Sequence, residues 1–461
     1  MAANYVLLGK VTVGSGGTTS VTFSSIPQTG YTDLVVRISC RTARTGSANA
    51  GLMVKLNNST TGYSSIDATY DGGSVASYSN LFNAGYVINT AGAAVDASVF
   101  TNQEIYIPNY ASANYKTFSS QSIVENTGTG ARNEMMATTW ANTAAITSIV
   151  FGEYAGNSID QHSTFYLYGI AKLNTTPTIL PYATGGDIIT TDGTYWYHTF
   201  ISSGTFTPQK TITCDYLVVA GGGGGGSGAN SGGGGAGGLR STVTATGGGG
   251  SLESKLFLTQ GTSYTAVVGS GGAGGASSGR HGTNGGNSFF GNIISYGGGG
   301  GAPPGNDEGY NNGLDGGSGG GGGLYGTKGG LGVSGQGFAG AGHPAWLSGS
   351  NLGGVNAGGG GGAGSVAATP TTTVPSSGGV GVQITALATP TGTGANSGYY
   401  AGGGAGNTNS YTPVGGLGGG GNMNTAGTAN TGGGGGAGGN TGGILGGAGG
   451  SGVIIIRYLV A

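Results

Sequence analysis

Apolar and polar residues follow two different patterns along the 461-residue chain. In the N-terminal part, short runs alternate apolar and polar residues or are rich in β-branched residues, and glycine, asparagine and aspartate separate them. Such runs are typical of half-buried β-strands. The strands predicted here are residues 6–13, 19–23, 33–40, 51–56, 104–107, 115–125, 134–140, 145–151 and 163–173.

We find no convincing amphipathic helix longer than two turns in this part of the chain. We therefore predict that residues 1–173 form an all-β domain of eight or nine strands. An antiparallel β-sandwich that is jelly-roll-like by its strand number fits this count best.

Beyond residue 173 the pattern changes. A polar stretch with prolines and glycines at residues 174–186 predicts a linker. A short β module is predicted at residues 187–220, and its last strand leads directly into Gly221. From there, apolar bursts alternate with glycine blocks at uneven intervals, which argues against a solenoid repeat. These bursts are residues 263–268, 289–296, 380–387 and 453–460.

Residues 221–461 hold 91 of the chain's 112 glycines, so this half is either unfolded or built around glycine. Only nine charged residues lie in it, too few for a self-repelling solvated coil, and disordered segments are normally poor in such apolar bursts. The glycines have no strict three-residue period and the chain has only 12 prolines, which excludes collagen. We predict a folded, glycine-rich scaffold over residues 221–461.

Extended polyglycine-II helices with interspersed short strands are the structure that this composition favours. A polyglycine-II rod has no internal hydrogen bonds, so its backbone groups must pair with neighbouring rods. We place Gly221, Gly223, Gly299 and Gly434 inside such rods. Ordering 91 glycines costs on the order of 100 to 180 kcal/mol, so nearly every backbone group must be paired, and we expect oligomerisation to help.

The charge and the cysteine content of the chain exclude several classes of function. The net charge is −2 and charged residues are 7% of the chain, which removes the usual electrostatic basis for binding nucleic acid or an anionic membrane. The start lacks the charged and apolar regions of a signal peptide, and no segment approaches 18 apolar residues, so we expect no export by that route and no membrane insertion. Cys40 and Cys214 are predicted to be buried free thiols.

Residues for catalysis or metal binding are sparse. None of the histidines, His162, His198, His281 and His343, has another histidine or cysteine at ligand spacing. Asp307, Glu308 and Asp315 form the only local acidic group in the glycine-rich half, and a solvated or Ca²⁺-binding loop explains it better than a glycosidase pair. We predict no cofactor, no resident metal and no enzymatic activity.

Aromatic residues in the connections between glycine runs are the best binding candidates. Flat rings stack on sugar faces and anchor protein interfaces with few rotamers to immobilise. The alternative is that these rings cover the sides of the scaffold or fill a subunit interface. The candidates are Tyr310, Tyr325, Phe338, Trp346, Tyr399, Tyr400 and Tyr411.

Four stretches carry a resemblance to a known family. They are residues 197–207 (YHTFISSGTFT), 215–226 (DYLVVA and six glycines), 285–291 (GGNSFFG) and 449–458 (GGSGVIIIRY). Together they resemble the glycine-rich domain of tailed-bacteriophage fibre and adhesin proteins, over about residues 187–461. Residues 1–173 look like the β-sandwich domains of phage virion structural proteins, without an equally sharp motif.

This resemblance implies a non-enzymatic virion surface protein, made in the host cytoplasm. It would be a tail fibre or adhesin, often a homotrimer, that attaches to other tail or capsid proteins. Loops on its glycine-rich scaffold would bind a host polysaccharide or outer-membrane protein. A capsid-surface fibre or decoration protein is the alternative in the same class. Less favoured are a capsular polysaccharide depolymerase and a cellular structural or ice-binding protein.

Overall fold

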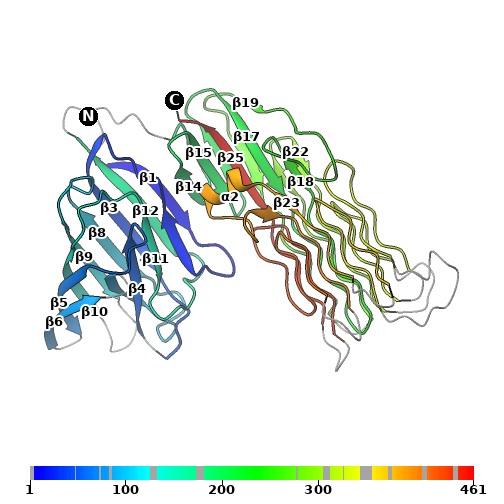
Figure 1. Cartoon of the computed structure of the whole chain (residues 1–461), viewed down its shortest axis with the longest axis horizontal. Coiled ribbons are helices and arrows are strands. Elements are labelled where there is room, and N and C mark those ends of the chain that lie inside the picture. The colour runs from blue at the N-terminus through cyan, green and yellow to red at the C-terminus, as the bar shows by residue number, and fades with distance from the viewer. Residues whose placement is uncertain are drawn as a thin grey trace. The chain divides into compact units, whose positions relative to one another are not determined.

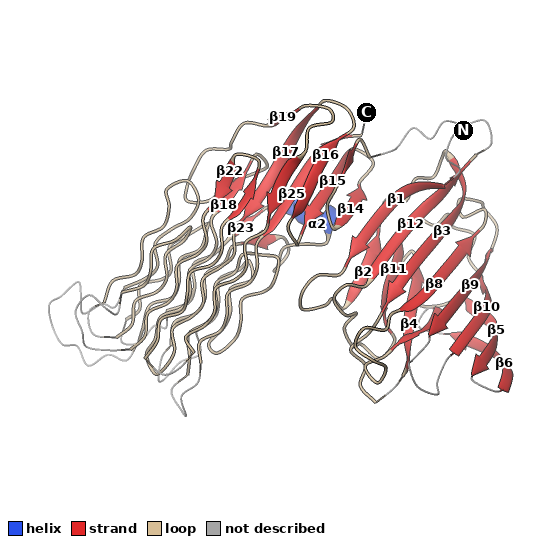
Figure 2. Ribbon diagram, turned by 180° about the vertical axis from the view of Figure 1, so that it is seen from behind, coloured by secondary structure: helices blue, strands red, loops and turns tan. Residues whose placement is uncertain are grey.

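The computed structural model describes residues 5–46, 48–71, 74–82, 86–124, 132–172, 181–276, 279–304, 312–324, 327–342, 356–371, 376–407, 413–439 and 445–460. The chain is all-β, with several antiparallel sheets and one short helix among these residues (Figure 2). It folds as two compact units. The sandwich unit comprises Met1–Pro181, Asp187–Trp196 and Leu459–Ala461, and the glycine-rich unit comprises Tyr182–Gly186 and Tyr197–Tyr458.

Two facing sheets form the sandwich unit. The larger one has the strand order β14-β1-β12-β3-β8-β9-β10-β5-β6, and the smaller one has the order β2-β11-β4-β7 (Figure 1). Their bounds are β1 Tyr5–Thr12, β2 Ser20–Phe23, β3 Tyr31–Cys40, β4 Asn49–Leu56, β5 Tyr63–Asp71, β6 Ser74–Phe82, β7 Tyr86–Ala91, β8 Thr101–Ile107, β9 Lys116–Val124, β10 Arg132–Trp140, β11 Ile149–Glu153, β12 Thr164–Ala171 and β14 Ile188–Thr191.

Eight of these strands have jelly-roll connectivity. The order β1-β12-β3-β8 faces the order β2-β11-β4-β7, and among these eight strands the chain passes from one sheet to the other at every step except from β4 to β7. The predicted jelly-roll-like sandwich is therefore confirmed. Between its sheets lies an apolar core that includes Leu34, Val36, Phe151 and Phe165.

The prediction of eight or nine strands is wrong, because β5, β6 and β7 were missed. The strand β5 alternates, but its buried positions are Ser65, Asp67 and Thr69, whereas Ile66 points outward with 65% of its surface exposed. A polarity pattern of this kind carries no signal for a core-facing strand. Together with β9 and β10, these strands extend the larger sheet beyond the eight jelly-roll strands.

The glycine-rich unit contains short strands and one helix. A central strand, β17, pairs with the C-terminal strand β25 and with β18 and β19. The bounds are β13 Ala183–Thr184, β15 Tyr195–Phe200, β16 Gly204–Pro208, β17 Ile212–Val219, β18 Leu239–Ser241, β19 Leu256–Leu258, β20 Tyr264–Val267, β21 Ser288–Phe290, β22 Ile293–Ser295, β23 Val382–Gln383, α2 Thr385–Thr391, β24 Tyr399–Tyr400 and β25 Val453–Leu459.

Residues 380–387 are not the single strand that their apolar residues predict. β23 is only two residues long, and α2 begins at Thr385 and ends before Gly392, whose φ of 66° forms a left-handed cap. Leu387 and Ala388 are buried on one side of the helix. Since the helix spans only two turns, its apolar residues are too few to show a helical period.

A buried carboxylate fixes the start of the glycine-rich scaffold. Asp215 lies on β17 directly opposite Arg457 of β25, with the Arg457 Nε 3.1 Å from Asp215 Oδ2. Lys255 Nζ is 3.3 Å from the same oxygen, and the Thr242 hydroxyl donates to Asp215 Oδ1 at 3.0 Å. The few charges of this unit thus hold together the sheet from which the first rod, residues 221–226, begins.

Hydrogen bonds of the first rod repeat with a period of three. The N–H groups of Gly221 and Gly224 donate to one neighbouring segment, those of Gly222 and Gly225 to a second, and those of Gly223 and Gly226 to a third. A threefold period with no bonds inside the rod is the signature of a polyglycine-II helix. These acceptor segments are residues 283–286, 447–450 and 232–235.

Three further segments donate to the carbonyl groups of the same rod. They are residues 298–301, 272–275 and 435–438, and each contributes two bonds of 2.8 to 2.9 Å. The rod therefore has six hydrogen-bonded neighbours, and all twelve N–H and C=O groups of residues 221–226 are paired. Figure 1 shows such rods side by side in the glycine-rich unit. The predicted polyglycine-II scaffold is confirmed.

Close packing explains why these positions are glycine. A Cβ atom added to Gly221, Gly223, Gly299 or Gly434 would lie within 3.0 Å of a carbonyl oxygen of a neighbouring segment, nearer than real Cβ atoms come. At Gly434 that oxygen belongs to Gly234. Since glycine alone leaves this space open, the identity of the residue is fixed by the distance between rods.

The substitution Gly434→Val tests this packing directly. A branched side chain must push the rod of Gly234 away and break its hydrogen bonds, so the glycine-rich unit should lose at least about 4 kcal/mol of stability or fail to fold. The matched control is Ala426→Val, which places the same valine side chain at an exposed position of the same region. Calorimetric unfolding distinguishes them, and equal stability of the two variants would contradict the packing.

A buried histidine makes the stability of this unit depend on pH. His198 has no exposed surface; its Nδ1 lies 2.6 Å from the carbonyl oxygen of Gly185 and its Nε2 lies 2.9 Å from the Tyr458 hydroxyl. The carbonyl can only accept, so Nδ1–H donates and Nε2 accepts from Tyr458. Burial lowers the pKa of His198 to about 4 from its ordinary value of 6.5.

Between pH 6.5 and pH 4 the unfolded chain binds a proton at His198 that the folded chain excludes. Stability from this group is therefore complete above pH 6.5 and falls as pH is lowered, by roughly 2 to 3 kcal/mol at pH 4.5. His198→Gln should flatten this part of the pH profile of unfolding, whereas His162→Asn, at an exposed position, should leave it unchanged. An identical slope for wild type and His198→Gln would refute the assignment.

Candidate functional site

Four of the seven predicted binding rings, Tyr310, Tyr325, Trp346 and Tyr411, lie outside the described residues. The remaining three, Phe338, Tyr399 and Tyr400, lie in the glycine-rich unit. The Phe338 ring is partly exposed, and the nearest atom to a Cβ built on Gly249 is the tip of this ring, at 3.6 Å. Tyr399 is half-buried in β24, opposite Gln383 of β23.

Tyr400 is part of the core and not of an exposed surface. It has no exposed surface, and its hydroxyl lies 2.7 Å from that of Thr393, which follows α2. Burial raises the pKa of Tyr400 to about 12. The prediction that this ring contacts a receptor is therefore not compatible with the folded unit, and Tyr400 instead fixes the loop that joins α2 to β24.

Sequence reasoning missed two cavities in the sandwich unit. The loop-end cavity has a volume of 660 Å³ and is formed by the loops at one end of the jelly roll. It is lined by Gly16, Gly17, Arg41, Ala97, Ser98, Phe100, Ser158, Asp160, Gln161 and His162. These residues lie far apart in the sequence and only the jelly-roll connectivity brings them together, so no local motif identifies them.

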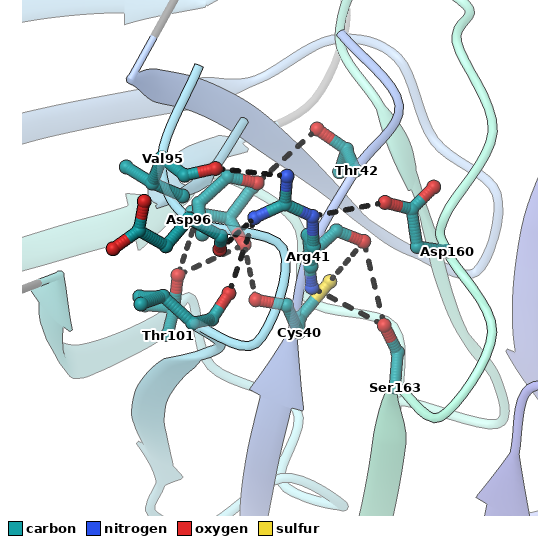
Figure 3. A network of polar contacts seen from close by, with 11 residues as sticks. Cys40, Arg41, Thr42, Val95, Asp96, Thr101, Asp160 and Ser163 are labelled. Carbon is teal, nitrogen blue, oxygen red and sulfur yellow. Dashed lines mark hydrogen bonds and ion pairs between the residues drawn. The ribbon is translucent and has the colours of Figure 1, made fainter. Parts of the chain in front are cut away.

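Arg41 organises the loop-end cavity (Figure 3). Its guanidinium donates to the carbonyl oxygens of Val95 at 3.0 Å and Asp96 at 2.7 Å, and its Nε lies 3.2 Å from the Asp160 carboxylate. Only 7% of Arg41 is exposed, so these contacts are largely shielded from solvent. Arg41, which directly follows β3, therefore joins the loop after β7 to the loop before β12.

The sheet cavity lies between the two sheets and has a volume of 310 Å³. Its lining is Asp67, Ile88, Asn89, Arg132, Glu134, Met136 and Tyr154. Glu134 Oε2 accepts a hydrogen bond of 3.0 Å from the backbone N–H of Asn89, and Gln103 Nε2 donates to the carbonyl oxygen of Asn89. Both contacts satisfy the backbone of β7, the edge strand of the smaller sheet.

Burial raises the pKa of Glu134, and the nearby Asp67 carboxylate raises it further. The N–H of Asn89 and the charge of Arg132 act in the opposite direction. Asp67 lies opposite Met136 on adjacent strands, and Glu134 lies opposite Thr69, so the two carboxyl groups are diagonal neighbours on one inner face. Such a pair can bind hydroxyl or amino groups, or exchange a proton with a ligand.

A row of polar side chains crosses the inner face beside the sheet cavity. Strand register places Thr69, Glu134, Ser122 and Gln103 next to one another on β5, β10, β9 and β8. The hydroxyl groups of Ser65, Thr69 and Ser122 have no hydrogen-bond partner among the described residues, although each residue is at most 3% exposed. Each buried hydroxyl without a partner costs about 1 to 3 kcal/mol, which is unusual in a structural core.

Some of the other residues singled out in the sequence, the cysteines and Asp315, lie among the described residues. Cys40 and Cys214 are free and buried, as predicted, and burial raises the pKa of each thiol to about 12, which makes both unreactive. Asp315 accepts a hydrogen bond from the backbone of Leu331 at 2.6 Å. Asp307, Glu308 and His343 lie outside the described residues. Among the described helices, none is long and apolar enough to span a membrane.

Arg41→Met tests the role of the buried ion pair. Removing the guanidinium leaves Asp160 and two loop carbonyl groups without their donor, which should cost about 3 to 5 kcal/mol of stability. The control is Arg37→Met, because Arg37 pairs with Glu104 at a site where both side chains are more than half exposed. That variant should cost less than about 1 kcal/mol. Denaturant unfolding measures both, and similar losses would exclude a special role for Arg41.

Comparison with known proteins assigns the larger part of the chain to a protein family. The family model described as a glycine-rich domain matches residues 201–459, which begin before β16 and end with β25. No curated protein matches the chain. The matched segment contains the polyglycine-II rods and the sheet held by Asp215 and Arg457. The chain therefore belongs to the family of glycine-rich domain proteins.

Proposed function

We propose that the protein is a bacteriophage tail fibre or adhesin that attaches the virion to its host without enzymatic action. The observation that carries this proposal is the first rod, whose backbone groups are all paired with six neighbours. A scaffold of this kind is rigid and has almost no reactive side chains. It is suited to hold intervening segments in place, and it offers little for catalysis.

Resemblance to phage fibre and adhesin proteins at both ends of the glycine-rich half supports the same function. The receptor would be a host polysaccharide or outer-membrane protein, contacted by the residues that interrupt the rods. Phe338 and Tyr399 are partly exposed and remain binding candidates. The protein would be made in the host cytoplasm and would act on the virion surface, joined to other tail or capsid proteins.

A homotrimer would give the virion several identical binding sites. One broad face of the sandwich unit favours association between copies, because the outward residues of β5, β9 and β10 carry no charge. Ile66, Met135, Tyr70 and Ile123 are exposed there by 65%, 61%, 51% and 41%. An apolar face without charge suits a second copy of the same chain, since like copies repel where they are charged.

Multivalent attachment follows from this arrangement. Several weak contacts on one fibre, and several fibres on one particle, raise the overall affinity without any new contact. A capsid-surface fibre or decoration protein would have the same architecture. A capsular depolymerase is a second candidate because two carboxyl groups, Asp67 and Glu134, share the sheet cavity, and Glu134 has a raised pKa.

Adsorption tests the proposed function. Purified protein should have the mass of a trimer by light scattering, bind the surface of host cells, and compete with virions for adsorption. Antibody to its C-terminus should label the tail in electron micrographs of virions. Label on the capsid would instead favour the decoration protein.

The control for this experiment is an assay for cleavage of the polysaccharide. Host polysaccharide incubated with the purified protein should show no increase in reducing ends. Sustained release of reducing ends would overturn the non-enzymatic function in favour of a depolymerase, and failure to compete with virions would overturn the adhesin.

A further inference from the structure

The polarity of the larger sheet is inverted in its extension. In β3 and β8, core residues such as Leu34 and Ile105 point inward, as expected for a sandwich. In β5, β9 and β10 the inward positions include Ser65, Asp67, Ser122 and Glu134, all at most 5% exposed. A sheet that only had to close the sandwich would bury apolar residues at these positions.

Structural roles explain only part of this polar face. Glu134 and Gln103 satisfy the backbone of Asn89 in the opposite sheet. Among the described residues, no such partner is found for the hydroxyl groups of Thr69 and Ser122 or for Arg132 Nε. Thr69 and Ser122 flank Glu134 on the two neighbouring strands, and Arg132 lines the cavity itself. Arg132 Nε is therefore a donor at the cavity that no described residue satisfies, while Thr69 and Ser122 keep the inner face beside the cavity polar.

Size and shape agree with a small polar ligand. The sheet cavity, at 310 Å³, lies at the lower end of the range of ligand pockets and has room for about ten water molecules. Its lining is not polar on every side, because Ile88 and Met136 are buried next to the carboxyl groups. Tyr154 contributes a ring that is 56% exposed. Polar groups at some positions and apolar surface at others match a pyranose ring, which has hydroxyl groups at its edge and C–H groups on its faces.

Charge limits which sugar fits. Two carboxyl groups, Asp67 and Glu134, line the cavity with one guanidinium, Arg132. Arg132 Nη2 lies 3.9 Å from Glu134 Oε1, which leaves little positive charge for an acidic ligand. Carboxylates accept hydrogen bonds from hydroxyl and ammonium groups but repel a uronate or sialate.

We infer that the sheet cavity of the sandwich unit is a binding site for one neutral or amino-bearing sugar residue of a polysaccharide. Asp67 and Glu134 would accept hydrogen bonds from the sugar, while Arg132 would donate to it. Tyr154 would lie at the mouth of the cavity. This site is independent of the glycine-rich unit and of the receptor contacts proposed for it.

A glycan array tests the site on the full-length protein. The probes are immobilised oligosaccharides of neutral, N-acetylated and amino sugars, and matched oligosaccharides that contain uronate or sialate. We expect binding within the first group and none in the second. With the best soluble probe, Asp67→Asn and Glu134→Gln should each weaken binding at least tenfold in calorimetric titration.

Glu104→Gln is the matched control, because it alters a carboxylate on the outer face of the same sheet. It should bind the probe like the wild type. Thermal unfolding without sugar separates binding from folding: Glu134→Gln keeps the shape of the side chain and an oxygen that accepts from the Asn89 N–H, so the variant should remain folded.

Three results would overturn the site: no binding to any neutral or amino sugar by the folded protein, equal affinity for the wild type, Asp67→Asn and Glu134→Gln, or preference for acidic sugars. Release of reducing ends that is lost in Asp67→Asn would support the site and overturn the non-enzymatic function. Loss of cell adsorption with sugar binding intact would overturn only the function proposed for the glycine-rich unit.

Discussion

The hydrogen bond between one glycine rod and the next is the interaction on which this structure depends. Each N–H in the first rod donates to a different neighbour from the N–H before it, so no pair of rods is held by a continuous ladder as in a sheet. The bonds form only when the rods are close, and the rods are close only where Cβ atoms are absent. The high glycine content and the packed rods therefore have the same cause, which is the short distance between rods that their hydrogen bonds require.

This constraint also determines where chemistry can occur. Residues inside the rods contribute backbone alone, and several of the few charged residues in the glycine-rich unit, such as Arg457 and Lys255, are used to hold its sheet together. In the sandwich unit, carboxyl and guanidinium groups line the sheet cavity. A scaffold with few reactive side chains and a sandwich with a polar cavity beside its apolar core divide structural and binding tasks between the two units.

The rods, the all-β class and the jelly roll could be predicted because each depends on local patterns: glycine runs, alternating apolar residues and turns. The strand β5 could not, because Ser65, Asp67 and Thr69 occupy its buried positions and Ile66 its exposed one. The cavities were missed for a related reason. Asp67 and Glu134 are 67 positions apart and meet only through the pairing of β5 with β10. Tyr400 was chosen for its ring type, but burial depends on the whole unit.

Hydrogen exchange of the first rod tests the central claim most directly. If residues 221–226 are paired with six neighbours, their amides should exchange only when the glycine-rich unit unfolds as a whole, although no regular strand or helix contains them. Mass spectrometry of peptides that cover these residues should show protection equal to that of β17. Exchange at the rate of an unstructured glycine chain, with β17 still protected, would contradict the account.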